Sequence, residues 1–136
     1  MRIVWNGHSC FTLESNQGTV VLDPYQPDSV PGLAPLSLRL GGCSHGHRDH
    51  NAREAVQLTG AAPALRIQEL HTFHDPEGGA LRGENTIHVI TAEGLRVAHL
   101  GDLGCWPGPE LLEQLRDLDA LLIPVGGYYT IDARQA

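Results

Sequence analysis

The chain has 136 residues, 41% of them hydrophobic, and nine basic against sixteen acidic side chains give a net charge of −7. This length predicts a single domain, residues 1–136, with a modest core. The negative charge argues against binding to nucleic acid, whose phosphates it would repel. No stretch approaches the roughly 20 apolar residues of a membrane span, and the N-terminus lacks a signal-peptide core, so we expect a cytoplasmic protein without a membrane partner.

The N-terminal part of the chain predicts a β-meander followed by a long loop. Strand composition and turn residues place three short strands at residues 2–6, 8–14 and 19–23. Prolines repeated from Pro24 to Pro35 exclude regular structure there and predict a surface loop of the kind that often borders a site. The chain is expected to return to the core through residues 36–44.

The rest of the chain alternates helix and strand patterns. Asn51 and Glu54 predict a capping box for a helix at residues 52–59. The later elements are expected at 64–73 and 85–102 (strands, with a turn at Glu93 and Gly94), at 108–118 (a helix) and at 120–125 (a buried strand). The sequence therefore predicts a mixed α/β (α+β) domain with antiparallel hairpins.

Three histidines and an aspartate lie among the six residues from His45 to His50. In an extended segment alternate side chains point the same way, so His45 and His47 can bind one cation together. Where the chain turns toward the predicted helix, Asp49 and His50 can offer a carboxylate and an imidazole to a second cation. A solvated loop that binds metal adventitiously is the alternative, but mixed ligand types at a strand-to-helix junction favour a built site.

This cluster supplies too few ligands alone, because a hydrolytic metal site typically has three protein ligands and one open position. Two further candidates end strand patterns: His74 precedes a glycine-rich turn, and Asp102 lies between two glycines of the segment GDLG. Either residue alone is typical of an ordinary turn. Together with the cluster, both become candidate ligands.

The segments SHGHRDH, FHD, RGENT and HLGDLG follow one another on a chain that opens with GHSCF and LDP. In this order they resemble the metallo-β-lactamase superfamily, and within it the small predicted zinc-dependent hydrolases related to ascorbate-6-phosphate lactonase. The resemblance covers nearly the whole chain. It implies an αββα sandwich, in which two mixed sheets lie face to face with helices outside and the metal ions sit on strand-end loops at one end.

The resemblance also implies two sets of metal ligands. One cation would be held by His45, His47 and His74, and the second by Asp49, His50 and a bridging Asp102. The implied cofactor is one or two Zn²⁺ ions, although Mn²⁺, Ni²⁺ or Fe also suit such ligands. The implied activity is hydrolysis of a small ester, lactone or phosphoester by a metal-bound hydroxide, with Asp49 orienting it and taking up its proton. The cations would attract an anionic small-molecule substrate despite the net charge.

Other residues are expected around this centre. The resemblance makes His8, Arg82 and Asn85 candidates for substrate binding or for support of the ligands. The alternatives are a half-buried strand histidine for His8 and a solvated hairpin residue for Arg82. His71 and His88 are expected to be structural, and His99 to have a supporting role.

The chain departs from this family pattern at its C-terminal end. Relatives usually continue to a later strand whose histidine completes the second metal site, whereas this sequence ends at Ala136. The fold is therefore expected to be truncated, and three accounts remain open: a fragment, a short member with one firm metal site, or a homodimer or larger oligomer that covers the exposed sheet edge. The alternative function is a metal-binding protein with weak or no catalysis and an interaction or regulatory role.

Overall fold

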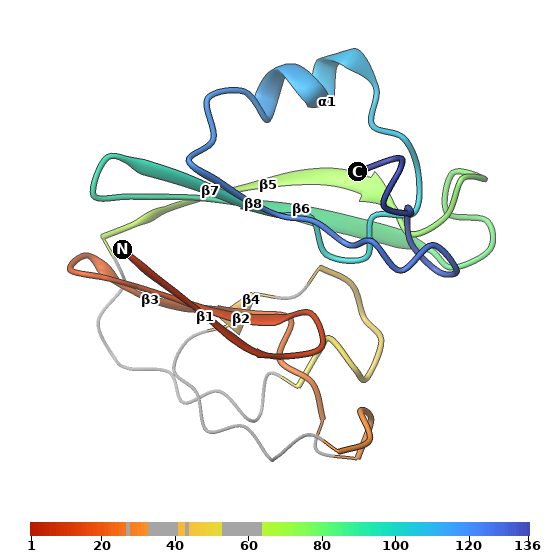
Figure 1. Ribbon diagram of the computed structural model, residues 1–136, viewed down its shortest axis with the longest axis horizontal. Helices are drawn as coiled ribbons and strands as arrows, with labels where there is room; N and C mark the ends of the chain where they lie inside the picture. The colour runs from red at the N-terminus through yellow and green to blue at the C-terminus, as the bar shows by residue number, and fades with distance from the viewer. Residues whose placement is uncertain (27, 33–40, 43, 53–63) are drawn as a thin grey trace.

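The computed structural model describes residues 1–26, 28–32, 41–42, 44–52 and 64–136. Its two four-stranded sheets lie face to face (Figure 1). The first sheet contains β1 (Arg2–Gly7), β2 (Cys10–Ser15), β3 (Gly18–Leu22) and β4 (Gly41–Gly42), and the second contains β5 (Arg66–Phe73), β6 (Glu84–Ala92), β7 (Leu95–His99) and β8 (Ala120–Leu122). One helix, α1 (Pro109–Gln114), lies on the outer face of the second sheet.

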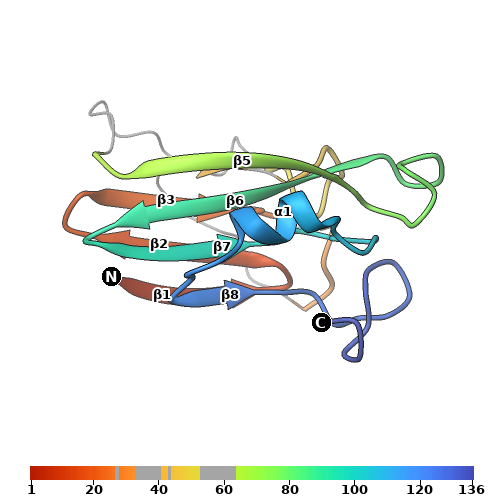
Figure 2. The same ribbon diagram turned by 90° about the horizontal axis from the view of Figure 1, so that it is seen from above.

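The two sheets have the same internal topology. In each, three antiparallel strands follow one another in chain order, and the fourth strand pairs parallel to the third. Strands of the two sheets run nearly along one direction, as the second view shows (Figure 2). The predicted turn at Glu93 and Gly94 is confirmed, since both have positive φ, 55° and 76°, as a tight hairpin turn requires.

The core has two layers because β6 and β7 are covered on both faces. Between the sheets, Leu13 and Leu22 of the first sheet pack against Ile90 and Val97 of the second. On the outer face of the second sheet, buried side chains pack against the apolar side of α1 and of the residues that follow it. This layer contains Ile87, Val89, Ala98, Leu100, Leu103, Leu111 and Leu115. The predicted α/β sandwich is therefore confirmed.

Several element boundaries differ from the predictions. The second strand begins at Cys10, since His8 has a positive φ of 51° and belongs to the preceding turn. The predicted helix at 108–118 ends at Gln114, because the chain turns through Asp117, whose φ is 53°, to enter β8. The helix predicted at 52–59 lies outside the described residues apart from Ala52.

None of the helices in the described ranges combines the length and the apolar character that crossing a membrane requires.

Candidate metal centre

The candidate ligands come from loops that meet at one end of the sandwich. The loop after β4 carries His45 to His50, the end of β5 leads into His74, and the loop after β7 carries Asp102. Figure 1 shows the loops after β4 and β5 at the same end of the two sheets. Backbone hydrogen bonds hold these segments: Thr86 N of β6 donates to Ser44 O at 2.7 Å, and Gly104 N of the loop after β7 donates to Phe73 O of β5 at 3.0 Å.

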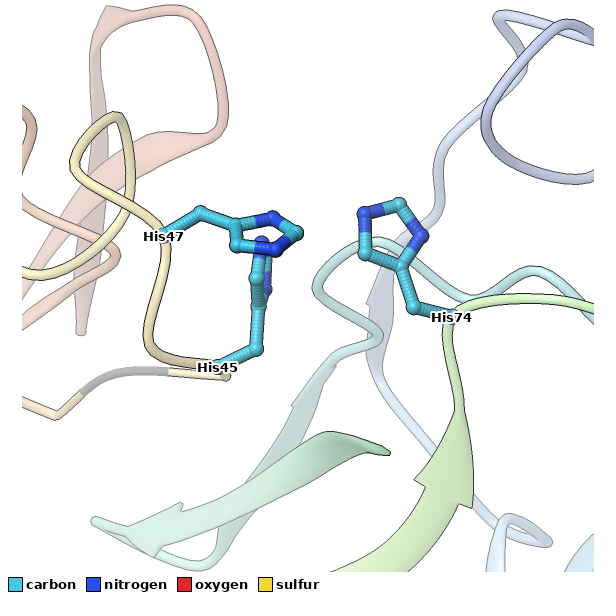
Figure 3. Close-up of side chains that lie close together, drawn as sticks. All are labelled: His45, His47 and His74. Carbon is cyan, nitrogen blue, oxygen red and sulfur yellow. The ribbon is translucent and has the colours of Figure 1, made fainter. Parts of the chain in front are cut away.

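Three imidazoles form the first donor group. His45 and His47 project from one loop toward His74, which follows β5 (Figure 3). A nitrogen of each ring lies within 4.8 Å of a nitrogen of each of the others. The ring centroids of His45 and His74 are 4.8 Å apart, and those of His47 and His74 are 5.5 Å apart. The structure therefore brings together the three histidines predicted for one cation, although they belong to different sheets.

The hydrogen bonds around His45 show that this group fits a cation. Ser44 Oγ donates its single proton to Asp23, so it can only accept from His45 Nδ1, which lies 2.9 Å away. The other nitrogen, His45 Nε2, then carries a lone pair, yet it is buried and has no hydrogen-bond partner among the described residues. A buried acceptor without a donor is costly, and a divalent cation would satisfy it.

His50, Asp49 and Asp102 form the second donor group beside the first. His50 Nε2 lies 3.7 Å from Asp49 Oδ2 and 3.3 Å from Asp102 Oδ2. Asp102 Oδ2 also lies 3.2 Å from His74 Nε2 and 3.9 Å from His45 Nε2. One oxygen of Asp102 therefore lies between the two groups, where a bridging ligand would be placed.

Asp23 supports His50 from behind and was not predicted as a site residue. Its buried carboxylate accepts a hydrogen bond from His50 Nδ1 at 2.8 Å and two from Ser44, from the backbone N and from Oγ, both at 2.6 Å. A carboxylate on the far nitrogen of a histidine fixes the ring and raises its basicity as a ligand. The positive φ of Asp23, 47°, is the local strain that turns the chain out of β3 into this position.

The ionisation of these groups follows from their burial and their partners. Burial opposes a charge on His50, but hydrogen bonds with Asp102 and Asp23 raise its pKa to about 10. Burial opposes ionisation of Asp102, but hydrogen bonds from His50 and His74 hold its pKa far below its usual range. Burial and the nearby charge of His50 lower the pKa of His45 to about 4. In the metal-free protein, His50 is therefore cationic and His45 neutral at neutral pH.

The backbone at Asp102 is positioned by Asn85. The Asn85 side chain is fully buried, donates from Nδ2 to Leu100 O at 2.9 Å and accepts at Oδ1 from Asp102 N at 3.0 Å. A Cβ added at Gly101, whose φ is 57°, would overlap Ser44 and Asn85. Asn85 therefore holds the backbone of a candidate ligand, whereas the substrate contact that was its other predicted role stays a prediction.

The loop after His74 is organised by Asp75. Its carboxylate accepts hydrogen bonds from four backbone N–H groups, those of Glu77, Gly79, Leu81 and Arg82. Burial opposes ionisation of Asp75, but these four bonds hold its pKa below the usual value. The bonds shape the loop so that His74 N can donate to Gly83 O at 3.0 Å. This support lies next to a predicted ligand, yet an aspartate before a proline gives no distinctive signal in the sequence.

The remaining predicted residues lie at the edges of the centre. His8 faces His50, with 3.1 Å between their Nε2 atoms. Arg82 lies near the loop of His47, and its guanidinium stands over the ring of Tyr129 at 5.3 Å. His99 donates to Ser9 O at 2.9 Å, a supporting contact of the predicted kind. The two histidines predicted to be structural, His71 and His88, lie on β5 and β6.

Comparison with known proteins identifies the family. A family model described as a β-lactamase superfamily domain matches residues 2–136. The chain therefore belongs to the metallo-β-lactamase superfamily. It is 27% identical to a metal-dependent hydrolase of Methanoculleus marisnigri, covering all of this chain and 73% of that protein. It is also 27% identical to a metal-dependent hydrolase of Thermoplasma acidophilum, covering 97% of this chain and 74% of that one.

Solved structures show the same fold. A metallo-β-lactamase superfamily protein of Thermotoga maritima superposes with a TM-score of 0.71 and 33% identity over 98% of this chain, which spans 66% of that protein. A metallo hydrolase of Ignicoccus hospitalis superposes with a TM-score of 0.67 and 22% identity over 98% of this chain and 74% of its own.

Proposed function

We propose that this protein is a metal-dependent hydrolase of small esters, lactones or phosphoesters, with one or two divalent cations held by the centre described above. The observation that carries the proposal is the convergence of His45 and His47 from the first sheet with His74 from the second, beside an Asp102 oxygen shared with His50. The names of the related hydrolases support the same reaction class.

The residues present fit such a centre. A bound divalent cation lowers the pKa of a coordinated water from about 15.7 to about 7 and polarises a substrate oxygen. Neutral imidazoles with carboxylates are a ligand set that suits Zn²⁺, and also Mn²⁺, Ni²⁺ or Fe. His45, His47 and His74 would hold the first cation, and Asp49, His50 and Asp102 the second.

Asp49 is the candidate for proton transfer. Its carboxylate is partly exposed, with 39% of the side-chain surface accessible, whereas Asp102 and His50 are more buried. A partly exposed carboxylate next to the centre can orient an attacking water and exchange its proton with solvent. Asp102 lies between His45, His50 and His74. This fixed position suits a bridging metal ligand better than a group that takes up a proton.

A cavity beside Asp102 is the place for a substrate. It has a volume of about 510 Å³ and extends from His8 and Asp102 past Phe11 to Tyr128. Its walls are mainly apolar, because Leu122, Ile123, Pro124 and Val125 line it. A small organic molecule would thus place its apolar part here and its scissile bond at the centre.

The opposite side of the centre is polar and carries Arg82. A second cavity of about 600 Å³ lies there, between the loop of His45 and His47 and the segment from Arg82 to Thr86. Arg82 and Glu84 both line this cavity, and the Arg82 guanidinium stands at its border, over the ring of Tyr129 from the first cavity. A guanidinium suits a phosphate or carboxylate, because it binds such groups bidentately. Arg82 would therefore favour an anionic substrate. A cytoplasmic location and assembly into a homodimer are part of the same proposal.

Matched histidine variants test the proposed function. The full chain is stripped of metal, reloaded with Zn²⁺ or Mn²⁺, and assayed with a chromogenic phosphodiester, an aryl ester and a lactone. We expect turnover that needs added metal and falls at least a hundredfold in His74→Ala. His71→Ala removes an exposed imidazole from β5, the strand that leads into His74, and should keep full activity. Metal binding without turnover of any of the three substrates would instead favour the non-catalytic alternative.

A further inference from the structure

His8 lies in the tight turn between β1 and β2, and its ring faces the second donor group. Its Nε2 atom lies 3.1 Å from His50 Nε2 and 3.4 Å from Asp49 Oδ2. The rings of His8 and His50 meet edge to face with centroids 4.8 Å apart. His8, Asp49 and His50 thus each offer one atom within 4.8 Å of the other two. The contact between His8 and His50 joins residues that are 42 positions apart in the sequence.

The spacing of these atoms matches the spacing of ligands around one cation. Ligand nitrogens at about 2.0–2.1 Å from a tetrahedral zinc ion lie about 3.3 Å from one another. The His8–His50, His8–Asp49 and His50–Asp49 pairs lie at 3.1, 3.4 and 3.7 Å. The His50–Asp102 pair lies at 3.3 Å. Three donor groups, with His8 as one of them, therefore stand around one position, and Asp102 adjoins them through His50.

The turn that carries His8 is held in an unfavourable backbone conformation. His8 has a φ of 51°, a left-handed conformation in which a residue with a side chain is strained, and Gly7 before it has a φ of 100°. Trp5 Nε1 donates to His8 O at 2.8 Å, and His99 Nε2 donates to Ser9 O at 2.9 Å. Strain that neighbouring contacts maintain is common where a side chain must be aimed at a site.

The charges around this position also call for a cation. Asp23, Asp49 and Asp102 lie around His50 and carry three negative charges when ionised. A hydrogen bond between the Nε2 atoms of His8 and His50 uses one proton for two nitrogens, whereas a divalent cation can accept a lone pair from both.

We propose that His8 is a direct ligand of the second cation, beside Asp49 and His50; the inference rests on the metal-dependent function proposed above. With Asp102, the second cation then has four protein ligands, all from this chain. His8 and Asp102 both line the apolar cavity. They thus connect the second cation to the place proposed for the substrate.

Cobalt binding to the full chain tests this assignment. Metal-free protein is titrated with Co²⁺, the absorption spectrum reports the coordination of each ion, and elemental analysis after gel filtration gives the number bound. The test variants are His8→Gly, which suits the left-handed backbone, and His8→Asn, which tolerates it and keeps a polar side chain. His71→Ala is the matched control, and circular dichroism checks the fold of each variant.

We expect two Co²⁺ ions per wild-type chain and per His71→Ala chain. His8→Gly should keep the first ion and bind the second at least tenfold more weakly, with an altered spectrum for the second ion only. Two ions bound by both His8 variants with wild-type affinity and spectrum would overturn the inference and leave the proposed function intact. A wild type that binds one ion overturns it too, and a wild type that binds none overturns the metal centre as a whole.

Discussion

The two ring nitrogens of His50 have different partners, and this difference determines its protonation. Nδ1 donates to Asp23, while Nε2 faces His8, Asp49 and Asp102. With a pKa of about 10, His50 is protonated in the metal-free protein at neutral pH. A cation that binds Nε2 must therefore displace a proton, whereas His45, with a pKa of about 4, is already neutral.

This difference predicts the pH dependence of metal binding. Because the proton competes with the metal at His50 below its pKa, the affinity for the second cation should rise with pH, by up to about tenfold per unit, between pH 7 and 9. Competition titrations against a chromophoric chelator, corrected for the protonation of the chelator, measure this slope. An affinity for the second cation that is constant from pH 7 to 9 would contradict the assignment of His50.

Asp23 gives a second prediction at this scale. Asp23→Asn keeps the shape of the side chain but removes the charge that holds the His50 and Ser44 donors. We expect a loss of about 1–3 kcal/mol in the free energy of unfolding and a 10- to 100-fold lower metal affinity. Denaturant unfolding of the metal-free protein and metal titration measure the two effects.

The matched control is Asp28→Asn. Asp28 is 72% exposed and pairs with Arg48 at 3.1 Å on the surface, so its neutralisation should change neither quantity appreciably. Equal effects of the two variants would show that Asp23 has no special role at the centre.

At the scale of elements, the end of β5 and the loop after β7 are packed without space for a side chain. Gly104 N donates to Phe73 O at 3.0 Å, and a Cβ at Gly104 would overlap the backbone of His74 and Asp75. The strand end that positions His74 is therefore fixed by direct backbone contact with the loop that follows Asp102.

Gly104→Ala should separate these two segments. We expect a destabilisation of about 1–3 kcal/mol from overpacking, together with weaker binding of the first cation because His74 is displaced. Gly108→Ala is the control, since a Cβ at Gly108 meets none of the described atoms within 4 Å. Thermal unfolding and metal titration of both variants check the prediction, and wild-type behaviour of Gly104→Ala would refute the packing argument.

Local patterns in the sequence predicted most of the described elements, and distant contacts explain what they missed. The strand predicted as buried at 120–125 is wrong in length and burial, because β8 (Ala120–Leu122) is an edge strand with Leu121 exposed. The turn at Glu93 and Gly94 was predictable because Gly94 readily adopts positive φ, whereas Glu93 adopts it against its own preference. The helix at α1 was predicted too long, since Leu115 and Leu118 continue its apolar face although the chain has already turned. The same limit applies to the site, where Asp23 reads as a turn residue before proline and meets His50 only through the fold, 27 positions away.

At the scale of the whole molecule, the candidate metal centre lies where the two sheets meet at one end of the sandwich. His45, His47 and His50 follow β4 of the first sheet, while His74 and Asp102 follow β5 and β7 of the second. A cation bound between them connects both sheets at one end of the sandwich. Neither spacing nor composition shows which loops lie at the same end of the sandwich. The prediction that these candidate ligands meet therefore came from the family resemblance.

Metal removal should therefore lower the stability of the entire domain. A ligand at about 100 times its dissociation constant stabilises the folded state by about 2.7 kcal/mol, which for a chain of this size corresponds to a rise of roughly 10 °C in Tm. Thermal unfolding with Zn²⁺ and after chelation measures the shift. His74→Ala should lose most of it and His71→Ala should retain it. An unchanged Tm on chelation in all three proteins would contradict a cation shared by the two sheets.

The division of the strands between the sheets has a consequence for biosynthesis. Every described strand of the first sheet precedes every described strand of the second along the chain, so the ribosome makes the first layer before the second. The histidines after β4 then emerge well before His74 and Asp102. With the proposed ligands, stable binding of the cations would wait until the second half of the polypeptide has been made and docked, so metal binding would be a late step in the folding of this protein.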